Sequence, residues 1–249
     1  MSLKRISLQE VAKKQYLFKL KSYFGVFGTL MLLQVIAMVF ASNGSSMYGT
    51  GSDQISMTIR YFSADMMIAF TLLWGFITSV LITTRGYRYD DFTFIANRLS
   101  SHLANIAFLV TISVFGGLTS MLSGFALKSI LYYFRGFESL KTISLLDAPV
   151  EVFVGIGATI LYVLLVCAVG YFVGMLAQFH KILVLVIPAA GFGSLYIGAG
   201  QNELPFILSV LNKHLFTESS FSLFAVKIII ISLILFSLSI VGSNRLGVR

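Results

Sequence analysis

Six uninterrupted apolar runs constrain this chain more than any other feature of its sequence. A helix needs about 20 apolar residues to cross the ~30 Å hydrocarbon core of a bilayer, because each residue advances it by about 1.5 Å. The runs are continuous rather than alternating, which argues against a strand barrel. We therefore predict an all-α integral membrane protein whose single domain, residues 1–249, has six transmembrane helices. The predicted spans are about 23–41, 66–84, 103–127, 152–176, 182–200 and 221–243.

The composition supports a lipid environment. Apolar residues make up 57% of the chain and charged residues 11%, whereas about a quarter of a soluble domain is charged. A chain with so few charges cannot cover a globule with polar surface. Lys227 is the one charged residue within a predicted span, near its outer end, where its stem can reach the interface.

The basic residues gather on one side of the predicted topology. The chain has 18 Lys and Arg against 10 Asp and Glu, and cytoplasmic loops of membrane proteins are enriched in Lys and Arg. This predicts a multi-pass protein with both termini in the cytoplasm. The excess charge then follows from topology and from contact with anionic membrane lipids, so nucleic acid is not a predicted partner. The bases on this side are Lys4, Arg5, Lys13, Lys14, Lys19, Lys21, Arg85, Arg88, Arg98, Lys181, Arg245 and Arg249.

The segment before the first span, residues 1–22, interleaves six bases with apolar residues. This pattern predicts a helix lying in the inner membrane interface and leading into the first span, with a frayed basic tail as the alternative. The start of the chain also resembles a signal peptide. Its charged lead and its apolar run are both long for one, which favours a retained first span.

Three segments are predicted to lie on the outer side. Residues 42–63 are rich in Ser and Gly and predict a flexible loop, whereas residues 128–149 carry aromatic residues suited to headgroup depth. The apolar helical part of residues 201–220, about eleven residues, is too short to span. Pro205 suits the first turn of a helix there, which predicts a short re-entrant or surface helix, with a plain loop as the alternative. Its apolar face contains Phe206, Val210 and Leu211.

The predicted spans lack the ionisable and metal-binding side chains on which ion coupling and catalysis depend. No Asp, Glu or His lies at the centre of any span, although ion-coupled carriers commonly place ionisable groups there. The three histidines are far apart and no metal-binding motif occurs, so we predict no catalytic, cofactor or metal residues. Gln34 is expected to form hydrogen bonds between helices, and the single cysteine, Cys167, is expected to be inert packing.

Glycines predict close approaches between helices. Gly170 and Gly174 form a GxxxG motif in the fourth span, and Gly191 and Gly193 lie in the fifth, after Pro188, which is expected to kink it. Small residues allow the backbones of two helices to touch. The motif predicts helix packing, with a dimer seam between two copies as one form of it.

The inner loop between the second and third spans is the most distinctive positive feature. Asp90 or Asp91 can cap a helix that begins at Phe92. An apolar stripe would then run along one side of that helix through Phe92, Ile95, Ala96 and Leu99, while Arg98 faces elsewhere. Such an amphipathic helix could insert into a groove on a cytoplasmic partner. The alternative is an interfacial helix that rests on lipid.

This layout resembles the permease subunit of a bacterial ABC-2-type transporter. That family has a basic interfacial helix before the first span, six spans with both ends inside, and a coupling helix between spans two and three. The resemblance covers the whole chain as architecture. It implies that Asp90, Asp91, Phe92, Ile95, Arg98 and Leu99 form the coupling helix, and that Glu203 to Phe216, including Pro205, Phe206, Val210 and Leu211, form an outer re-entrant element.

The resemblance also implies partners. The phosphate-binding motif GxxxxGK[ST] is absent from the sequence, so ATP and Mg²⁺ would bind to a separate ABC ATPase, and the chain itself would not be an enzyme. Two permease copies, or two related ones, would assemble in the plasma membrane of a bacterial cell. The chain is similar in size to permeases of antibiotic or bacteriocin export and immunity. The charge-poor spans favour an amphipathic, peptide or lipid-like substrate.

Two other classes of function remain open from the sequence. One is an ATP-independent carrier or channel, against which the lack of charges at the centre of the spans counts. The other is a non-transporting membrane subunit, such as a sensor or an assembly factor.

Overall fold

The computed structural model describes residues 7–44, 46–52, 55–61, 63–84, 86–87, 97–135, 149–178, 182, 186, 189 and 220–245. Five helices in these ranges are long and apolar enough to cross a membrane, which confirms a multi-pass architecture whose candidate membrane spans, in this part of the chain, are all α-helical. The predicted span 182–200 lies outside the described residues apart from three isolated positions. The described elements are α1 (Leu8–Ser22), α2 (Phe24–Ala41), β1 (Ser46–Ser52), β2 (Ile55–Tyr61), α3 (Asp65–Ile82), α5 (Arg98–Arg135), α6 (Pro149–Leu176) and α9 (Phe221–Arg245).

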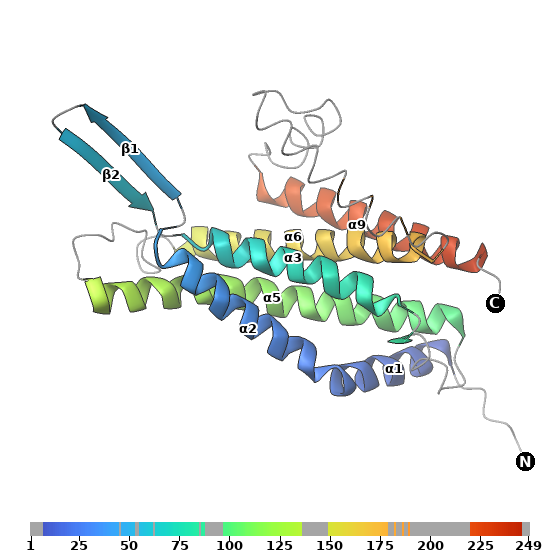
Figure 1. The fold of residues 1–249 in the computed structure, drawn as a ribbon. Coiled ribbons are helices and arrows are strands. Elements are labelled where there is room, and N and C mark those ends of the chain that lie inside the picture. The colour runs from blue at the N-terminus through green and yellow to red at the C-terminus, as the bar shows by residue number, and fades with distance from the viewer. Residues whose placement is uncertain are drawn as a thin grey trace, which may run out of the picture.

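The five long helices form an elongated bundle (Figure 1). α3 packs against α2, α5 and α6, and α9 packs mainly against α6. The end of the bundle that carries α1 also contains the end of α3, the start of α5 and the ends of α6 and α9; we call it the α1 end. The opposite end, from which the β-strands project, is called the hairpin end (Figure 1). The N-terminal helix and the C-terminal end of α9 therefore lie at the same end, as the sequence predicts.

α1 and α2 are separate helices joined by one residue. α1 begins after Ser7, whose hydroxyl accepts a hydrogen bond from the Glu10 N–H at 3.3 Å and so satisfies a helix-end donor. Tyr23 ends α1, because its backbone (φ −102°, ψ 27°) departs from helical geometry. α2 then starts at Phe24, close to the predicted start of the first span.

The segment predicted as a flexible outer loop contains a β-hairpin instead. β1 and β2 pair antiparallel, from Ser46 opposite Tyr61 to Ser52 opposite Ile55. Only residues 53 and 54 separate the strands, a connection length typical of tight hairpins. The physical reason is visible in Ile55, Met57, Ile59 and Tyr61, which alternate with other residues as a strand requires. The high Ser and Gly content of the segment hid this alternation.

α5 is longer than the predicted third span, 103–127. Its 38 residues correspond to a length of about 57 Å, nearly twice the thickness of the hydrocarbon core. The predicted span covers only the continuous apolar run of the sequence, and α5 extends beyond that run at both ends. Tyr132, Tyr133 and Phe134, predicted to lie at headgroup depth, form the exposed last turns of α5.

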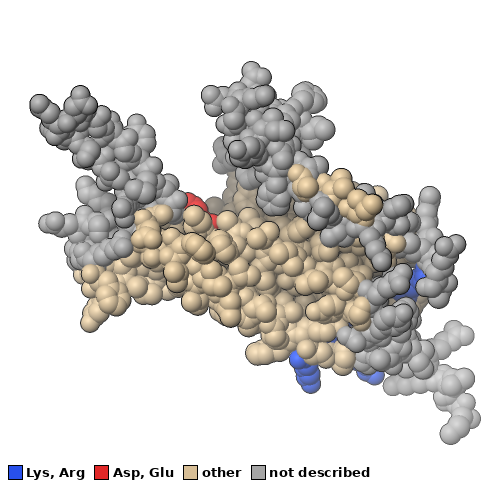
Figure 2. Space-filling view, viewed as in Figure 1, with Lys and Arg blue, Asp and Glu red and all other residues tan. Residues whose placement is uncertain are grey.

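The described charged side chains divide unevenly between the two ends. Figure 2 shows Lys and Arg over α1 and the neighbouring end of the bundle, and acidic atoms near the start of α3. This division follows the predicted topology, in which the basic end faces the cytoplasm. Described side chains at the α1 end are Lys13, Lys14, Lys19, Lys21, Arg98 and Glu10, and those at the hairpin end are Asp65, Lys128, Glu151 and Lys227.

Candidate functional site

The described residues on either side of the predicted coupling helix both lie at the α1 end. Tyr87 follows the end of α3, and Arg98 and Leu99 begin α5. Asn97 is not helical, and its carbonyl accepts hydrogen bonds from the backbone N–H groups of Ser100 and Ser101. Arg98 and Leu99 thus belong to the first turn of the long helix α5. Asp90, Asp91, Phe92 and Ile95 lie outside the described residues.

An aromatic cluster holds the first end of the loop. The Tyr87 ring meets the Tyr23 ring edge-on, with 4.8 Å between the ring centroids. Tyr23 in turn contacts Phe108 of α5, at 6.1 Å between centroids. Edge-to-face aromatic pairs contribute about 0.5–1.5 kcal/mol each beyond the area that they bury. The loop after α3 is thereby fixed to the junction between α1 and α2 and to α5.

A buried histidine holds the second end. His102, one turn after Arg98, uses both ring nitrogens: Nδ1 lies 2.6 Å from the Tyr171 hydroxyl of α6, and Nε2 lies 2.7 Å from the Ser243 hydroxyl of α9. A neutral imidazole offers one donor and one acceptor, and each hydroxyl can take the complementary role. Arg98 Nη1 also donates to the Ser243 carbonyl at 3.4 Å. The start of α5 is therefore joined to the ends of both α6 and α9.

The same network reaches α1 through a buried lysine. Lys19 is 1% exposed, and its ammonium donates to the Asn105 side-chain carbonyl oxygen. Asn105 Nδ2 lies 3.4 Å from the Tyr171 hydroxyl and donates to it. One helical turn earlier on α1, the Tyr16 hydroxyl shares a 2.9 Å hydrogen bond with Thr111. Lys19, Asn105, Tyr171, His102 and Ser243 form what we call the inner polar network, which connects α1, α5, α6 and α9.

A second polar cluster lies deeper in the bundle, around Gln34. Its amide nitrogen donates to Thr71 of α3 at 3.1 Å and to Thr119 of α5 at 3.0 Å. The Ser123 hydroxyl lies 3.3 Å from the Gln34 oxygen but donates at 2.7 Å to the Thr119 carbonyl. This confirms the expected hydrogen bonds of Gln34 between helices. Since both amide hydrogens are used within the chain, the cluster holds helices together and offers little to a ligand.

The two glycines of the GxxxG motif lie against α3 of the same chain. A Cβ at Gly170 would be 2.7 Å from the Phe76 carbonyl oxygen, and one at Gly174 would contact Thr83 and the Val80 Cα. These two positions therefore face an intrachain contact rather than a seam with a second copy. Cys167 is buried in the same region, and its thiol lies 3.6 Å from the Gly75 carbonyl. Gly191 and Gly193 lie outside the described residues.

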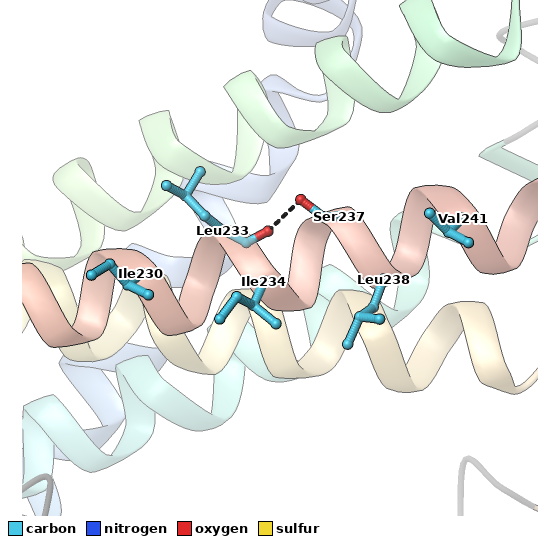
Figure 3. Close-up of a pocket in the computed structure, with 6 residues that line it drawn as sticks. All are labelled: Ile230, Leu233, Ile234, Ser237, Leu238 and Val241. Atoms are coloured by element: carbon cyan, nitrogen blue, oxygen red, sulfur yellow. Dashed lines mark hydrogen bonds between the residues drawn. The ribbon is translucent and has the colours of Figure 1, made fainter.

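A shallow groove of about 330 Å³ runs along α9, lined by Ile230, Leu233, Ile234, Ser237, Leu238 and Val241. Figure 3 shows that all six side chains come from this one helix and that the Ser237 hydroxyl points to the Leu233 carbonyl. The groove offers no reactive group and suits contact with lipid chains. Within the described ranges, no cluster of three His, Cys, Asp or Glu could hold a metal.

The buried hydroxyl of Ser232 provides a test of how α9 packs in the bundle. The Ser232 hydroxyl is buried and forms no hydrogen bond with the described residues, and an unsatisfied buried hydroxyl costs about 1–3 kcal/mol. Ser232→Ala is therefore expected to raise the free energy of unfolding by about 1 kcal/mol, measured by denaturation in mixed micelles. Ser239→Ala is the matched control, because the Ser239 hydroxyl is equally buried but donates to the Leu235 carbonyl at 2.8 Å. An equal gain in both variants would show that the missing hydrogen bond of Ser232 is not the cause.

Sequence reasoning did not select the residues of the inner polar network as a site. His102 is joined to partners 69 and 141 residues away in the sequence, and no local motif signals such contacts. The outer segment with Pro205, Phe206, Val210 and Leu211 lies outside the described residues. A comparison with protein-family models, curated proteins and solved structures finds no match to this chain.

Proposed function

We propose that this chain is the transmembrane permease subunit of an ATP-driven ABC transporter of the ABC-2 type. A separate ATPase would bind the cytoplasmic loop between α3 and α5, and two permease copies or paralogues would form the complex. The observation that carries this proposal is the attachment of the loop at both of its ends. Tyr87 is held by the aromatic cluster at the α1–α2 junction, and His102 is held by α6 and α9.

This attachment suits the transmission of force. A loop that only connects two spans needs no buried contacts at its ends, whereas a loop that a partner pushes must be continuous with the elements that move. Displacing residues 88–96 would act on α3 and the α1–α2 junction through Tyr87, and on α6 and α9 through His102. ATP and Mg²⁺ would act on the ATPase, and this chain would supply the moving helices and the transport path.

The chemistry of the described spans supports the substrate class that we propose. Among the described residues, the polar groups around Gln34 are an amide and hydroxyls that are bonded within the chain, and many large apolar side chains are exposed on the helices. An amphipathic, peptide or lipid-like substrate fits such surfaces better than a small ion. Export of an antibiotic or bacteriocin, or immunity to one, is the role that we propose.

The decisive experiment is co-purification with the ATPase, sought first among neighbouring reading frames that contain GxxxxGK[ST]. Phe92→Asp combined with Ile95→Asp places two charges on the proposed contact stripe. Because a central apolar contact contributes about 2 kcal/mol or more to an interface, the recovered ATPase is expected to fall at least about tenfold. Recovery is measured by quantitative immunoblotting of the purified permease fraction.

Thr93→Asp combined with Asn97→Asp is the charge-matched control, because these two positions lie off the predicted stripe. This control is expected to retain the ATPase. Equal recovery with both double variants would remove the coupling helix from the proposal. Solute flux through the reconstituted chain without any ATPase would favour a carrier or channel instead.

A further inference from the structure

The side of α1 that faces the bundle is mainly polar. Gln15 and Lys19 are its two fully buried residues, each 1% exposed, and they lie one helical turn apart. Tyr16 and Leu20 contact the apolar core but are only partly buried. α2, by contrast, completely buries large apolar residues such as Leu30. An element with few buried apolar contacts opens at a lower free energy than the rest of a protein, which makes α1 the helix that leaves the bundle most easily.

The Gln15 amide weakens the contact between α1 and the bundle further. Neither its nitrogen nor its oxygen forms a hydrogen bond with the described residues, although both atoms are shielded from solvent. Burial without a hydrogen-bond partner is unfavourable for an amide, because the amide loses its bonds to water and gains none. The opposite side of α1 carries the exposed Lys13, Lys14 and Lys21, so water is within reach. Movement of α1 away from the bundle would therefore hydrate the Gln15 amide.

Side-chain hydrogen bonds hold α1 against α5. The Tyr16 hydroxyl lies 2.9 Å from the Thr111 hydroxyl, and the Lys19 ammonium donates to Asn105. Thr111 also donates to the Ala107 carbonyl within α5 at 2.9 Å, so it keeps a partner when Tyr16 leaves. The net contribution of one such bond to stability is modest, because water replaces it when it breaks. A movement that breaks both contacts uncovers Asn105 and, with it, the inner polar network.

Tyr23 has the geometry of a hinge between α1 and α2. Its φ of −102° and ψ of 27° interrupt the helix, and Figure 1 shows that the chain changes direction there. Its N–H donates to the Lys19 carbonyl at 2.9 Å and its carbonyl accepts from the Val26 N–H at 2.9 Å, so each helix is closed on its own side. A residue between two elements can absorb a change in φ and ψ while both elements stay intact.

We propose that α1 is a hinged cover over the polar first part of α5. It turns about Tyr23, leaves α5 and exposes Gln15, Lys19 and Asn105 to solvent at the α1 end; on its return it buries them again. The Tyr87 ring contacts the Tyr23 ring, so a movement of the loop between α3 and α5 shifts the balance between the two positions. The inference goes beyond the proposed function, because the cover and its hinge belong to this chain and require no ATPase.

The test is hydrogen exchange of the whole chain in lipid nanodiscs at fixed pH, followed by mass spectrometry of peptides from α1 and α2. Away from α5, a helix of 15 residues is marginally stable, so its amide hydrogens exchange whenever α1 leaves. We expect the amides of α1 to exchange together, at least about tenfold faster than those of α2. A rate that instead rises gradually toward Leu8 would indicate fraying from the end and would contradict the hinge at Tyr23.

Gln15→Leu removes the amide without a partner and leaves an apolar side chain in the contact with α5. Exchange of α1 is expected to slow about tenfold, with α2 unchanged. Gln9→Leu is the matched control, because it makes the same substitution at an exposed position of the same helix; it should change the rate by less than about threefold. Tyr16→Phe, which removes the bond to Thr111, should accelerate exchange of α1 about fivefold.

Two further outcomes would overturn the proposal. Equal exchange rates in α1 and α2 of the unaltered chain would show that α1 does not leave the bundle separately. A Gln15→Leu protein whose α1 exchanges as fast as that of the Gln9→Leu protein would show that the buried amide does not favour release. The fluorescence of the single tryptophan, Trp74, checks that each variant is folded.

Discussion

Replacing Gly117 with alanine is expected to destabilise the bundle, because the added methyl group would meet the backbone of α6. A Cβ at Gly117 would lie 2.5 Å from Ile160 Cγ1, 2.8 Å from its Cα and 2.9 Å from its N. Two of these atoms are backbone, so α5 and α6 must separate to make room. Overpacking of this kind costs about 1–3 kcal/mol, and we expect a loss of about 2 kcal/mol.

The measurement is reversible unfolding in mixed micelles of increasing denaturing detergent. Trp74 is a suitable probe, because it is buried and lies beside Gly116, the neighbour of Gly117. Gly28→Ala is the matched control: it adds the same methyl group to α2, where nothing lies within 4 Å. There the better helix propensity of alanine is expected to leave stability unchanged or raised by up to about 1 kcal/mol. A Gly117→Ala protein as stable as the Gly28→Ala protein would refute the close contact.

Replacing His102 with leucine is expected to separate the end of α9 from the start of α5. Leucine is apolar, so the Ser243 hydroxyl loses its bond to the ring and the Tyr171 hydroxyl keeps only the longer contact with Asn105 among the hydrogen bonds described above. Each buried hydroxyl left unsatisfied costs about 1–3 kcal/mol, and we expect a total loss of about 3 kcal/mol. Hydrogen exchange at the last turns of α9 should become faster, since the Ser243 contact fixes that end.

A double-mutant cycle with Ser243→Ala separates this contact from general damage to the core. If the two side chains interact, the double variant should lose about 0.5–3 kcal/mol less than the sum of the single losses. Ser237→Ala is the control on the same helix, because among the described residues its exposed side chain donates to the Leu233 carbonyl of its own helix. It should change stability by less than about 0.5 kcal/mol. Strict additivity between His102→Leu and Ser243→Ala would show that the two residues are not coupled.

The spans that the structure describes could be predicted from the sequence because a helix that crosses a bilayer requires a long apolar run, and soluble domains rarely contain one. The hydrogen bonds of Gln34 to neighbouring helices could also be predicted, since an amide within an apolar run must find hydrogen-bond partners. The β-hairpin was missed because its first strand, Ser46–Ser52, is rich in Ser, Gly and Thr, a composition that indicated a loop. The boundaries of α5 were missed because a helix does not end where lipid ends.

The inner polar network could not be predicted, for a different reason. Each of its members is ordinary in its local sequence: Lys19 looks like one of several interfacial lysines, and His102 like a solvated residue at the end of a span. Their partnership arises only when α1, α5, α6 and α9 come together. Gly117 was overlooked likewise, because it has no glycine four residues away, unlike Gly170 and Gly174.

The length of α5 has a mechanical consequence. Gly117, where α5 touches the backbone of α6, lies almost halfway between Arg98 and Arg135, which makes that contact a fulcrum with two arms of nearly equal length. Once the His102 contacts with α6 and α9 are broken, a tilt of about 10° around it would carry each tip sideways by about 5 Å, in opposite directions, since each arm is about 28 Å long. Rigid tilting of α5 about this contact would convert a small movement at one end of the helix into an equal movement at the other end, without a hinge within the helix.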